Sequence, residues 1–294
     1  MRIRTSVSAI AAALVLVVTG PVTSAGARAA NPWTQTVYAL GPQDSYVAEY
    51  TGSGWTVIGG AGTQLLAGEN GVFEVVANGD IERYDGTPND WTVVGGPGAQ
   101  FAEGGGSLYA IGPNDAYVAQ WDGLNAGWSQ IGGPAVNIYA GGDGLVATSP
   151  DGYDAYRYDG TPGQWSLISN TVDTGPFVVG TSAIYVIESL NRILYQWDGS
   201  GTSWTQIGGP TLGLYAGATG VFMTPWVDLP PGVYQYDGTP EQWTLIGGYG
   251  GQFVSSASTL YGLGPADDYV GQWSGSGTGW TQIGGPAWAI AAGN

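Results

Sequence analysis

Short apolar runs alternate with turns along almost the whole chain. In the stretch 134–170, apolar or alternating runs cover 136–140, 145–148, 155–158 and 165–168, and clusters of Gly, Pro, Ser and Asp separate them. Runs of this length, broken by turn residues about every 8 to 12 positions, are typical of antiparallel β-strands. After residue 30 no segment has the 3.6-residue periodicity of a helix. The pattern predicts an all-β protein built from four-stranded units.

The four-stranded unit recurs at a nearly fixed period. A tryptophan opens each fourth strand, at intervals of 36, 37, 37, 39, 39 and 37 residues: Trp55, Trp91, Trp128, Trp165, Trp204, Trp243 and Trp280. Five of them open the motif W-[ST]-x-I-G-G, Trp91 opens W-T-V-V-G-G, and Trp165 opens W-S-L-I-S-N. A period of this length is typical of solenoids and propellers. We expect these anchor tryptophans to pack between neighbouring units, and the glycines to allow a tight crossing to the next unit.

The two ends of the chain hold complementary parts of one unit. Before Trp55 there is sequence for three strands only, and after the last I-G-G-P motif there is one more apolar run, 287–293. Together these fragments make a complete four-stranded unit, whereas an open solenoid would need polar capping repeats. The sequence predicts one domain, residues 30–294, folded as a seven-bladed β-propeller of about 37 residues per blade, closed by a three-plus-one split blade.

The third strand of every repeat ends in an aromatic residue. Asp follows it in five repeats, and Gly comes next in all seven. Asp-Gly is a favoured tight turn, so this aromatic-Asp-Gly column has a purely structural interpretation. The alternative is a ring of shallow sugar sites, because an aromatic face covers sugar C–H groups and a carboxylate accepts from sugar hydroxyls. The candidate ligand-binding residues are Trp121 with Asp122, Trp197 with Asp198, Tyr84 with Asp85, Tyr158 with Asp159, Tyr236 with Asp237, and Trp273.

Charge and targeting signals limit the choice of partners. Residues 1–29 have a charged start, a short apolar stretch and Ala27-Arg28-Ala29, which together predict a secretory signal peptide cleaved near Ala29. The formal net charge is −17, and loss of the three arginines at positions 2, 4 and 28 leaves 3 − 23 = −20. So acidic a chain repels nucleic acids and anionic lipid surfaces. We expect a secreted protein, extracellular or envelope-associated, with no nucleic-acid partner and no membrane insertion.

Missing residue types limit the chemistry. The chain has no Cys, no His and no Lys. A Ser-His-Asp triad, a Schiff base and a His- or Cys-ligated zinc are therefore excluded. We expect no cofactor and no metal: Asp151, Asp154, Asp267 and Asp268 cluster in loops, but they match no calcium-binding loop motif.

The repeat itself resembles a known family. The pattern W-x-x-I-G-G-x-x-x-x-I-x-A-G, followed by a short aromatic strand and Y-[DS]-G, is similar to the tectonin-type propeller repeat over essentially the whole mature chain. The resemblance implies a propeller of the lectin type that binds sugars or glycan-decorated surfaces. Two departures stand out: Ser169-Asn170 replace Gly-Gly, and Thr51 and Ser274 replace Asp.

Three functions remain open at the level of sequence. The leading hypothesis is a non-enzymatic carbohydrate-binding module with several weak, equivalent sites, because copied loops give multivalency rather than one asymmetric catalytic centre. The rival is a protein-binding scaffold, which would present one contiguous apolar patch. The irregular sixth repeat, with Trp226 and Asp228, and the fifth, with Glu188 and Arg192, are where a unique site would lie. A glycosidase needs two carboxylates in one pocket, and the off-pattern acids to consider are Glu188, Asp228 and Asp173.

Overall fold

The computed structural model describes residue 33 and residues 35–170 and 174–293. Residues 31–294 form one compact unit. The predicted signal peptide lies outside the described residues. In the part of the chain that is described, no helix is long and apolar enough to cross a membrane.

The described strands form antiparallel sheets, most of them of four strands. The sheets are, in order, β1 (Val37–Leu40), β2 (Val47–Tyr50) and β3 (Trp55–Gly59) with β27 (Ala289–Ala292); β4 (Gln64–Gly68), β5 (Gly71–Val75), β6 (Ile81–Tyr84) and β7 (Trp91–Gly95); β8 (Gln100–Gly104), β9 (Ser107–Ile111), β10 (Val118–Trp121) and β11 (Trp128–Gly132); β12 (Asn137–Gly141), β13 (Gly144–Thr148), β14 (Ala155–Tyr158) and β15 (Trp165–Ser169); β16 (Thr174–Val179), β17 (Ile184–Glu188), β18 (Ile193–Trp197), β19 (Trp204–Gly217), β20 (Gly220–Pro225), β21 (Val233–Tyr236) and β22 (Trp243–Gly247); and β23 (Phe253–Ser255), β24 (Leu260–Leu263), β25 (Val270–Trp273) and β26 (Trp280–Gly284). Two short 3-10 turns, Pro42–Asp44 and Pro113–Asp115, lie between second and third strands of their sheets.

One sheet departs from the four-stranded pattern. Strand β19 is 14 residues long and is shared by two units, so β16 to β22 form a single seven-stranded sheet. The cause is strand pairing at the crossing. Pro210 pairs with Ile193 and Thr211 pairs with Pro225, so the chain stays extended where other repeats leave the sheet.

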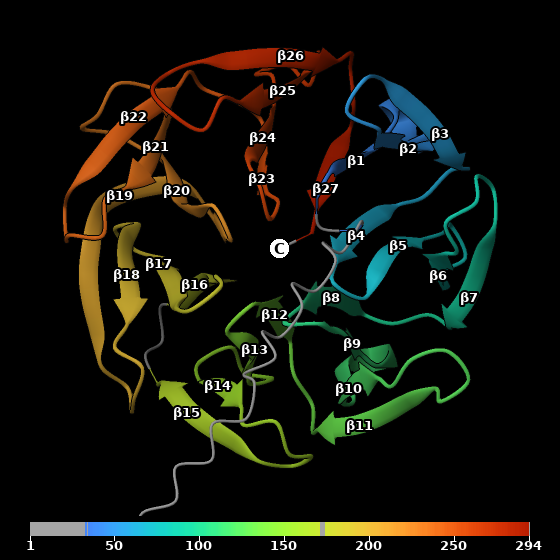
Figure 1. The fold of residues 1–294 in the computed structure, drawn as a ribbon. Helices are drawn as coiled ribbons and strands as arrows, with labels where there is room; N and C mark the ends of the chain where they lie inside the picture. The colour runs from blue at the N-terminus through green and yellow to red at the C-terminus, as the bar shows by residue number, and fades with distance from the viewer. Residues whose placement is uncertain (1–32, 34, 171–173, 294) are drawn as a thin grey trace, which may run out of the picture. The chain divides into compact units, whose positions relative to one another are not determined.

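Within this unit the sheets surround a common centre, with β4, β8, β12, β16, β23 and β27, the first strands of their repeats, innermost (Figure 1). Side-chain amides join some of these first strands. Gln100 donates from Nε2 to the carbonyl oxygen of Ile138 at 2.8 Å and accepts from the Ile138 amide at 2.8 Å. Gln252 makes the same pair of bonds to Ile290 of β27, at 3.0 and 2.9 Å. Strand β27 also pairs with β1 and contacts both β23 and β4. The last strand is thus tied to the first strands on either side of it.

Buried apolar side chains fill the spaces between successive sheets. One cluster combines Tyr109 and Ile131 of the β8–β11 sheet with Ile138, Leu145 and Tyr158 of the β12–β15 sheet. The β4–β7 sheet contributes to two such clusters, one shared with the β1–β3 sheet and one with the β8–β11 sheet, so each unit depends on its neighbours for its core. The arrangement is that of a β-propeller, as the sequence repeat predicts.

Candidate functional site

The anchor tryptophans are built into the joints between sheets. Each indole Nε1–H donates to a backbone carbonyl oxygen of the preceding repeat: Trp55 to Ile283 (2.8 Å), Trp91 to Ile58 (2.8 Å), Trp128 to Val94 (2.7 Å), Trp165 to Ile131 (3.0 Å), Trp204 to Ile168 (2.9 Å), Trp243 to Ile207 (2.8 Å) and Trp280 to Ile246 (2.8 Å). The prediction that they pack between units is confirmed.

The indole also explains the first glycine of the I-G-G motif. A Cβ atom on Gly284 would lie 2.7 Å from Nε1 of Trp55, and one on Gly59 would lie 2.9 Å from Nε1 of Trp91. Neither glycine adopts a positive φ. The residue is therefore glycine because the next tryptophan sits against its backbone, and not because of an unusual turn conformation.

The aromatic rings of the predicted sites serve the core. Tyr84, Trp121, Tyr158 and Trp273 are buried, whereas Trp197 and Tyr236 are half-buried. Several of these rings pack on other aromatic rings: Trp121 meets Phe73 edge-on at 5.6 Å, Trp273 meets Phe222 at 6.1 Å, and Tyr84 lies 5.1 Å from Trp91. A ring face that protein atoms cover offers little area to a sugar.

The aspartates of the same column are exposed, and each accepts a hydrogen bond from a hydroxyl seven residues later. The pairs are Thr92 to Asp85 (2.5 Å), Ser129 to Asp122 (2.6 Å), Ser166 to Asp159 (3.0 Å), Thr205 to Asp198 (2.8 Å) and Thr244 to Asp237 (3.0 Å). These bonds close the loop between the third and fourth strands. They agree with the turn interpretation of the column. The second oxygen of Asp85 pairs with the Arg83 guanidinium at 3.5 Å.

One predicted pair lies in a polar cavity. Tyr158 and Asp159 line a space of about 360 Å³ together with Arg157, Asp143 and Gln120. Arg157 donates to the backbone oxygen of Asp143 at 2.9 Å, and its guanidinium lies 3.5 Å from the Asp143 carboxylate. Burial, and then the nearby Tyr109, raise the pKa of Tyr158, so its hydroxyl stays protonated at neutral pH. Donors and acceptors of this kind suit a hydroxyl-rich ligand.

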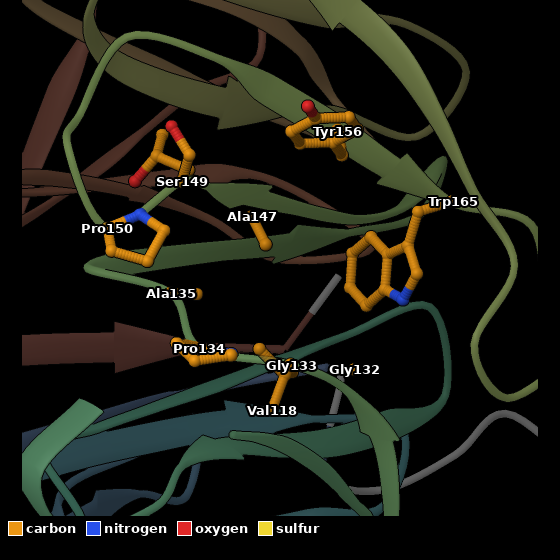
Figure 2. Close-up of a pocket in the computed structure, with 11 residues that line it drawn as sticks. Val118, Gly132, Gly133, Pro134, Ala135, Ala147, Ser149, Pro150, Tyr156 and Trp165 are labelled. Carbon is orange, nitrogen blue, oxygen red and sulfur yellow. The ribbon is translucent and has the colours of Figure 1, made fainter. Parts of the chain in front are cut away.

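A second kind of cavity lies between neighbouring sheets, and the sequence did not point to it. One example, of about 340 Å³, lies between the β8–β11 and β12–β15 sheets. Figure 2 shows Trp165 and Tyr156 on one side and the crossing segment Gly133-Pro134-Ala135 on the other. Both aromatic side chains are half-buried, so part of each ring faces the cavity. The lining is mostly apolar, with the Ser149 hydroxyl at the edge.

The same cavity recurs at two other joints. About 220 Å³ is enclosed by Trp55, Tyr46 and the crossing segment Gly285-Pro286-Ala287, and about 280 Å³ by Trp280, Tyr269 and Gly248-Tyr249-Gly250. In each case the anchor tryptophan, a tyrosine of the same repeat and the preceding crossing segment form the walls. We call these three spaces the inter-sheet cavities.

The tyrosines that line these cavities follow a pattern in the sequence. Six repeats carry a tyrosine either two or four positions before the aromatic end of the third strand: Tyr46, Tyr117, Tyr156, Tyr195, Tyr234 and Tyr269. Because the spacing switches between two values, no single column aligns them. Their role depends on the neighbouring sheet, which a pattern within one repeat does not reveal.

Two of the acids singled out in the sequence, Glu188 and Asp151, serve local structure. The Glu188 carboxylate accepts from the backbone amides of Leu190 and Asn191, at 2.6 and 2.8 Å, and so caps a turn. The Ser149 hydroxyl and the Tyr153 amide bond to Asp151 and lower its pKa. Asp173 lies outside the described residues. Among the residues that are described, no group of three or more acids is placed to hold a metal ion.

Comparison with known proteins identifies the fold and no family. No family model and no curated protein matches the sequence. Among solved structures, the chain is similar to AztD from Citrobacter koseri (10% identity, TM-score 0.59, covering 87% of this chain and 96% of that one). It is also similar to YCF48 bound to D1 peptide (14%, 0.51, 88% and 93%). A third match is PorZ, a surface component of the type-IX secretion system of Porphyromonas gingivalis (12%, 0.55, 86% and 38%).

This chain thus spans well under half of the PorZ chain. Likeness at such low identity shows a β-propeller fold, and propellers serve many functions. The resemblance to tectonin-type repeats stays a prediction.

Proposed function

We propose that this chain is a secreted carbohydrate-binding protein, a seven-bladed propeller that holds sugars in its inter-sheet cavities. Counting β19 in two units gives seven four-stranded blades. The pairing of β27 with β1, and the bond from Trp55 to Ile283, support closure by a three-plus-one blade. In this proposal the protein is not an enzyme, and its partner is a glycan or a glycan-bearing surface.

The observation that carries the proposal is the recurrence of one aromatic-lined cavity at three joints. Partly exposed tryptophan and tyrosine rings can cover the C–H face of a sugar, while the hydroxyl of the tyrosine and nearby backbone groups offer hydrogen bonds. Several like sites on one molecule raise the affinity for a repeated glycan without any new contact. The polar cavity at Arg157, Tyr158 and Asp159 offers a further sugar site with a different lining.

The test is a glycan array probed with the purified protein and with three multiple variants. The first is Tyr46→Ala, Tyr156→Ala and Tyr269→Ala, which removes one wall of each inter-sheet cavity. The second carries Asp→Asn at 85, 122, 159, 198 and 237, which alters the aspartate column and leaves these cavities intact. The third, Trp121→Ala with Trp197→Ala, removes two aromatic rings of the aromatic-Asp-Gly column.

We expect the tyrosine variant to lose binding of a defined glycan class and the five-fold aspartate variant to keep it. Loss in the aspartate variant alone would move the sites to the Asp-Gly loops. Circular dichroism of every variant separates a lost site from a lost fold. If the folded protein binds no glycan, the proposal fails.

The rival function, a protein-binding scaffold, has one observation of its own. Trp226, Val227 and Leu229 of the irregular sixth repeat are exposed, and the Arg192 guanidinium lies 4.8 Å from the centre of a Trp226 ring. Tryptophan and arginine are frequent anchors of protein interfaces. Pull-down from the native secretome with the wild-type protein and with Trp226→Ala tests this alternative. Capture of one partner that the variant loses would favour it.

A further inference from the structure

One joint between sheets has two carboxylates at positions where an inter-sheet cavity is lined by an apolar and an aromatic side chain. In the β12–β15 sheet the cavity wall includes Ala147 and Tyr156, which are directly opposed on β13 and β14. The equivalent opposed pair in the β4–β7 sheet is Glu74 on β5 and Glu82 on β6. Directly opposed residues share one face of a sheet, so two carboxylates stand where the other joint has a methyl group and a phenol ring.

Glu74 is a buried acid with an oxygen atom that no described residue satisfies. Only 3% of its surface is exposed, and its Oε2 atom is buried without a hydrogen-bond partner. Burial, and then the charge of Glu82, raise the pKa of Glu74 to about 7. A buried carboxylate beside a second carboxylate is unfavourable unless a proton or a cation joins them.

The backbone of the joint makes room for this carboxylate. The crossing segment has Gly62 at the position where Ala135 and Ala287 line two of the inter-sheet cavities and Gly250 lines the third. A Cβ atom on Gly62 would lie 2.9 Å from Oε2 of Glu74. The glycine therefore accommodates the carboxylate beneath the crossing segment.

No cation among the described residues reaches the pair. There is no lysine in the sequence, and the arginines of the described residues are bound elsewhere. Arg83, next to Glu82, points to the opposite face of the sheet and donates to the backbone oxygen of Asn70 at 3.1 Å. Arg157 and Arg192 bond to backbone oxygens of Asp143 and Thr211.

We propose that the joint between the β1–β3 and β4–β7 sheets binds the primary ammonium group of an amino sugar, held between Glu74 and Glu82. An ammonium group carries three donors, which two carboxylates and a backbone carbonyl can satisfy. Calcium is a poorer fit, because it takes six to eight oxygen ligands and the described residues hold no group of three acids suited to a metal. That the ammonium group sits on a sugar rests on the proposed function; the preference for an amine does not.

The test compares ligands that differ in the amine alone. Isothermal titration in about 150 mM salt, where surface charges are screened beyond roughly 8 Å, is run with a glucosamine tetramer, the N-acetylglucosamine tetramer, and n-butylamine. We expect the glucosamine tetramer to bind at least tenfold more tightly than its acetylated form. Glu74→Gln and Glu82→Gln should each abolish that preference, whereas Glu241→Gln, an exposed acid elsewhere, should preserve it.

The outcomes separate this inference from the proposed function. Equal, measurable affinity for the two tetramers overturns the inference, as does equal weakening by Glu241→Gln, which would show attraction to the overall negative charge. Binding of calcium in place of amine, lost in Glu74→Gln, also overturns it. Glu-dependent binding of n-butylamine, with no glycan bound anywhere, would uphold the ammonium site and refute the lectin. Glu82 is half-buried, so Glu82→Gln provides a folded variant if Glu74→Gln misfolds.

Discussion

The indole Nε1–H of Trp55 donates to the carbonyl oxygen of Ile283, 2.8 Å away and 228 positions along the sequence. Six other tryptophans make the same bond to the repeat just before them, over 33 to 36 positions. Trp55 alone reaches across the chain to its far end. At six joints the bond therefore connects repeats that are neighbours in the sequence. At the seventh joint it connects the first repeat to the last.

Replacing Trp55 by phenylalanine should lower stability more than its size suggests. The variant keeps an aromatic ring but leaves the Ile283 carbonyl without its donor, which costs about 1–3 kcal/mol. For a chain of this size the melting temperature should fall by roughly 2–4 °C per kcal/mol, measured by calorimetry. Trp226→Phe, at an exposed tryptophan, is the matched control and should change little. An unchanged melting temperature for Trp55→Phe would contradict a structural role for the bond.

Two adjacent glycines should respond differently to alanine. A Cβ atom on Gly284 meets the Trp55 indole at 2.7 Å, whereas one on Gly285 has nothing within 4 Å. Gly284→Ala should cost about 1–3 kcal/mol by overpacking, and Gly285→Ala should be nearly neutral. Urea unfolding of both variants measures the difference. Equal effects would show that the crossing conformation, and not the indole, requires glycine.

Stability should fall as pH rises toward neutrality. Burial is the main cause that raises the pKa of Glu74 and of Glu103 from 4.5 to about 7. Between these values the folded protein binds more protons than the unfolded chain, so the free energy of unfolding decreases with pH and levels off above about 7. For Glu74 the change is at most roughly 3 kcal/mol. Melting temperatures from pH 5 to 8 should fall less in Glu74→Gln; an identical slope would refute a buried acid there.

Binding to a glycan surface should depend steeply on the number of intact cavities. Removing Tyr46, Tyr156 and Tyr269 one at a time should leave the affinity of each remaining site for a free monosaccharide unchanged. Retention on a glycan-coated sensor should fall by on the order of tenfold or more with each site lost, because linked sites raise avidity by large factors. Tyr153→Ala, at an exposed tyrosine outside the cavity lining, is the control. If the total binding of monosaccharide and the retention on the sensor both fell only in proportion to the number of sites removed, the sites would bind independently.

The sequence by itself determined the β-repeat architecture, the approximate strand boundaries in the one repeat read in detail (134–170) and the packing role of the anchor tryptophans. Strand alternation, turn residues and a constant period are local properties, so a pattern within one repeat specifies them. The continuous β19 was not foreseen, because its extension depends on pairing partners on both sides, Ile193 and Pro225. The tertiary structure decided what each column faces.

Tyr84 and Trp121 end third strands, a position for which the sequence left both a packing role and a sugar-binding role. Both side chains are buried where the core joins one repeat to the next. Tyr156 lines a cavity, and Glu74 is buried, because a crossing segment that follows the preceding repeat packs against each of them. Glu82 lies directly opposite Glu74 on the same sheet. Each cavity between sheets is lined by residues of two different repeats, and the contact between them exists only once the sheets have packed.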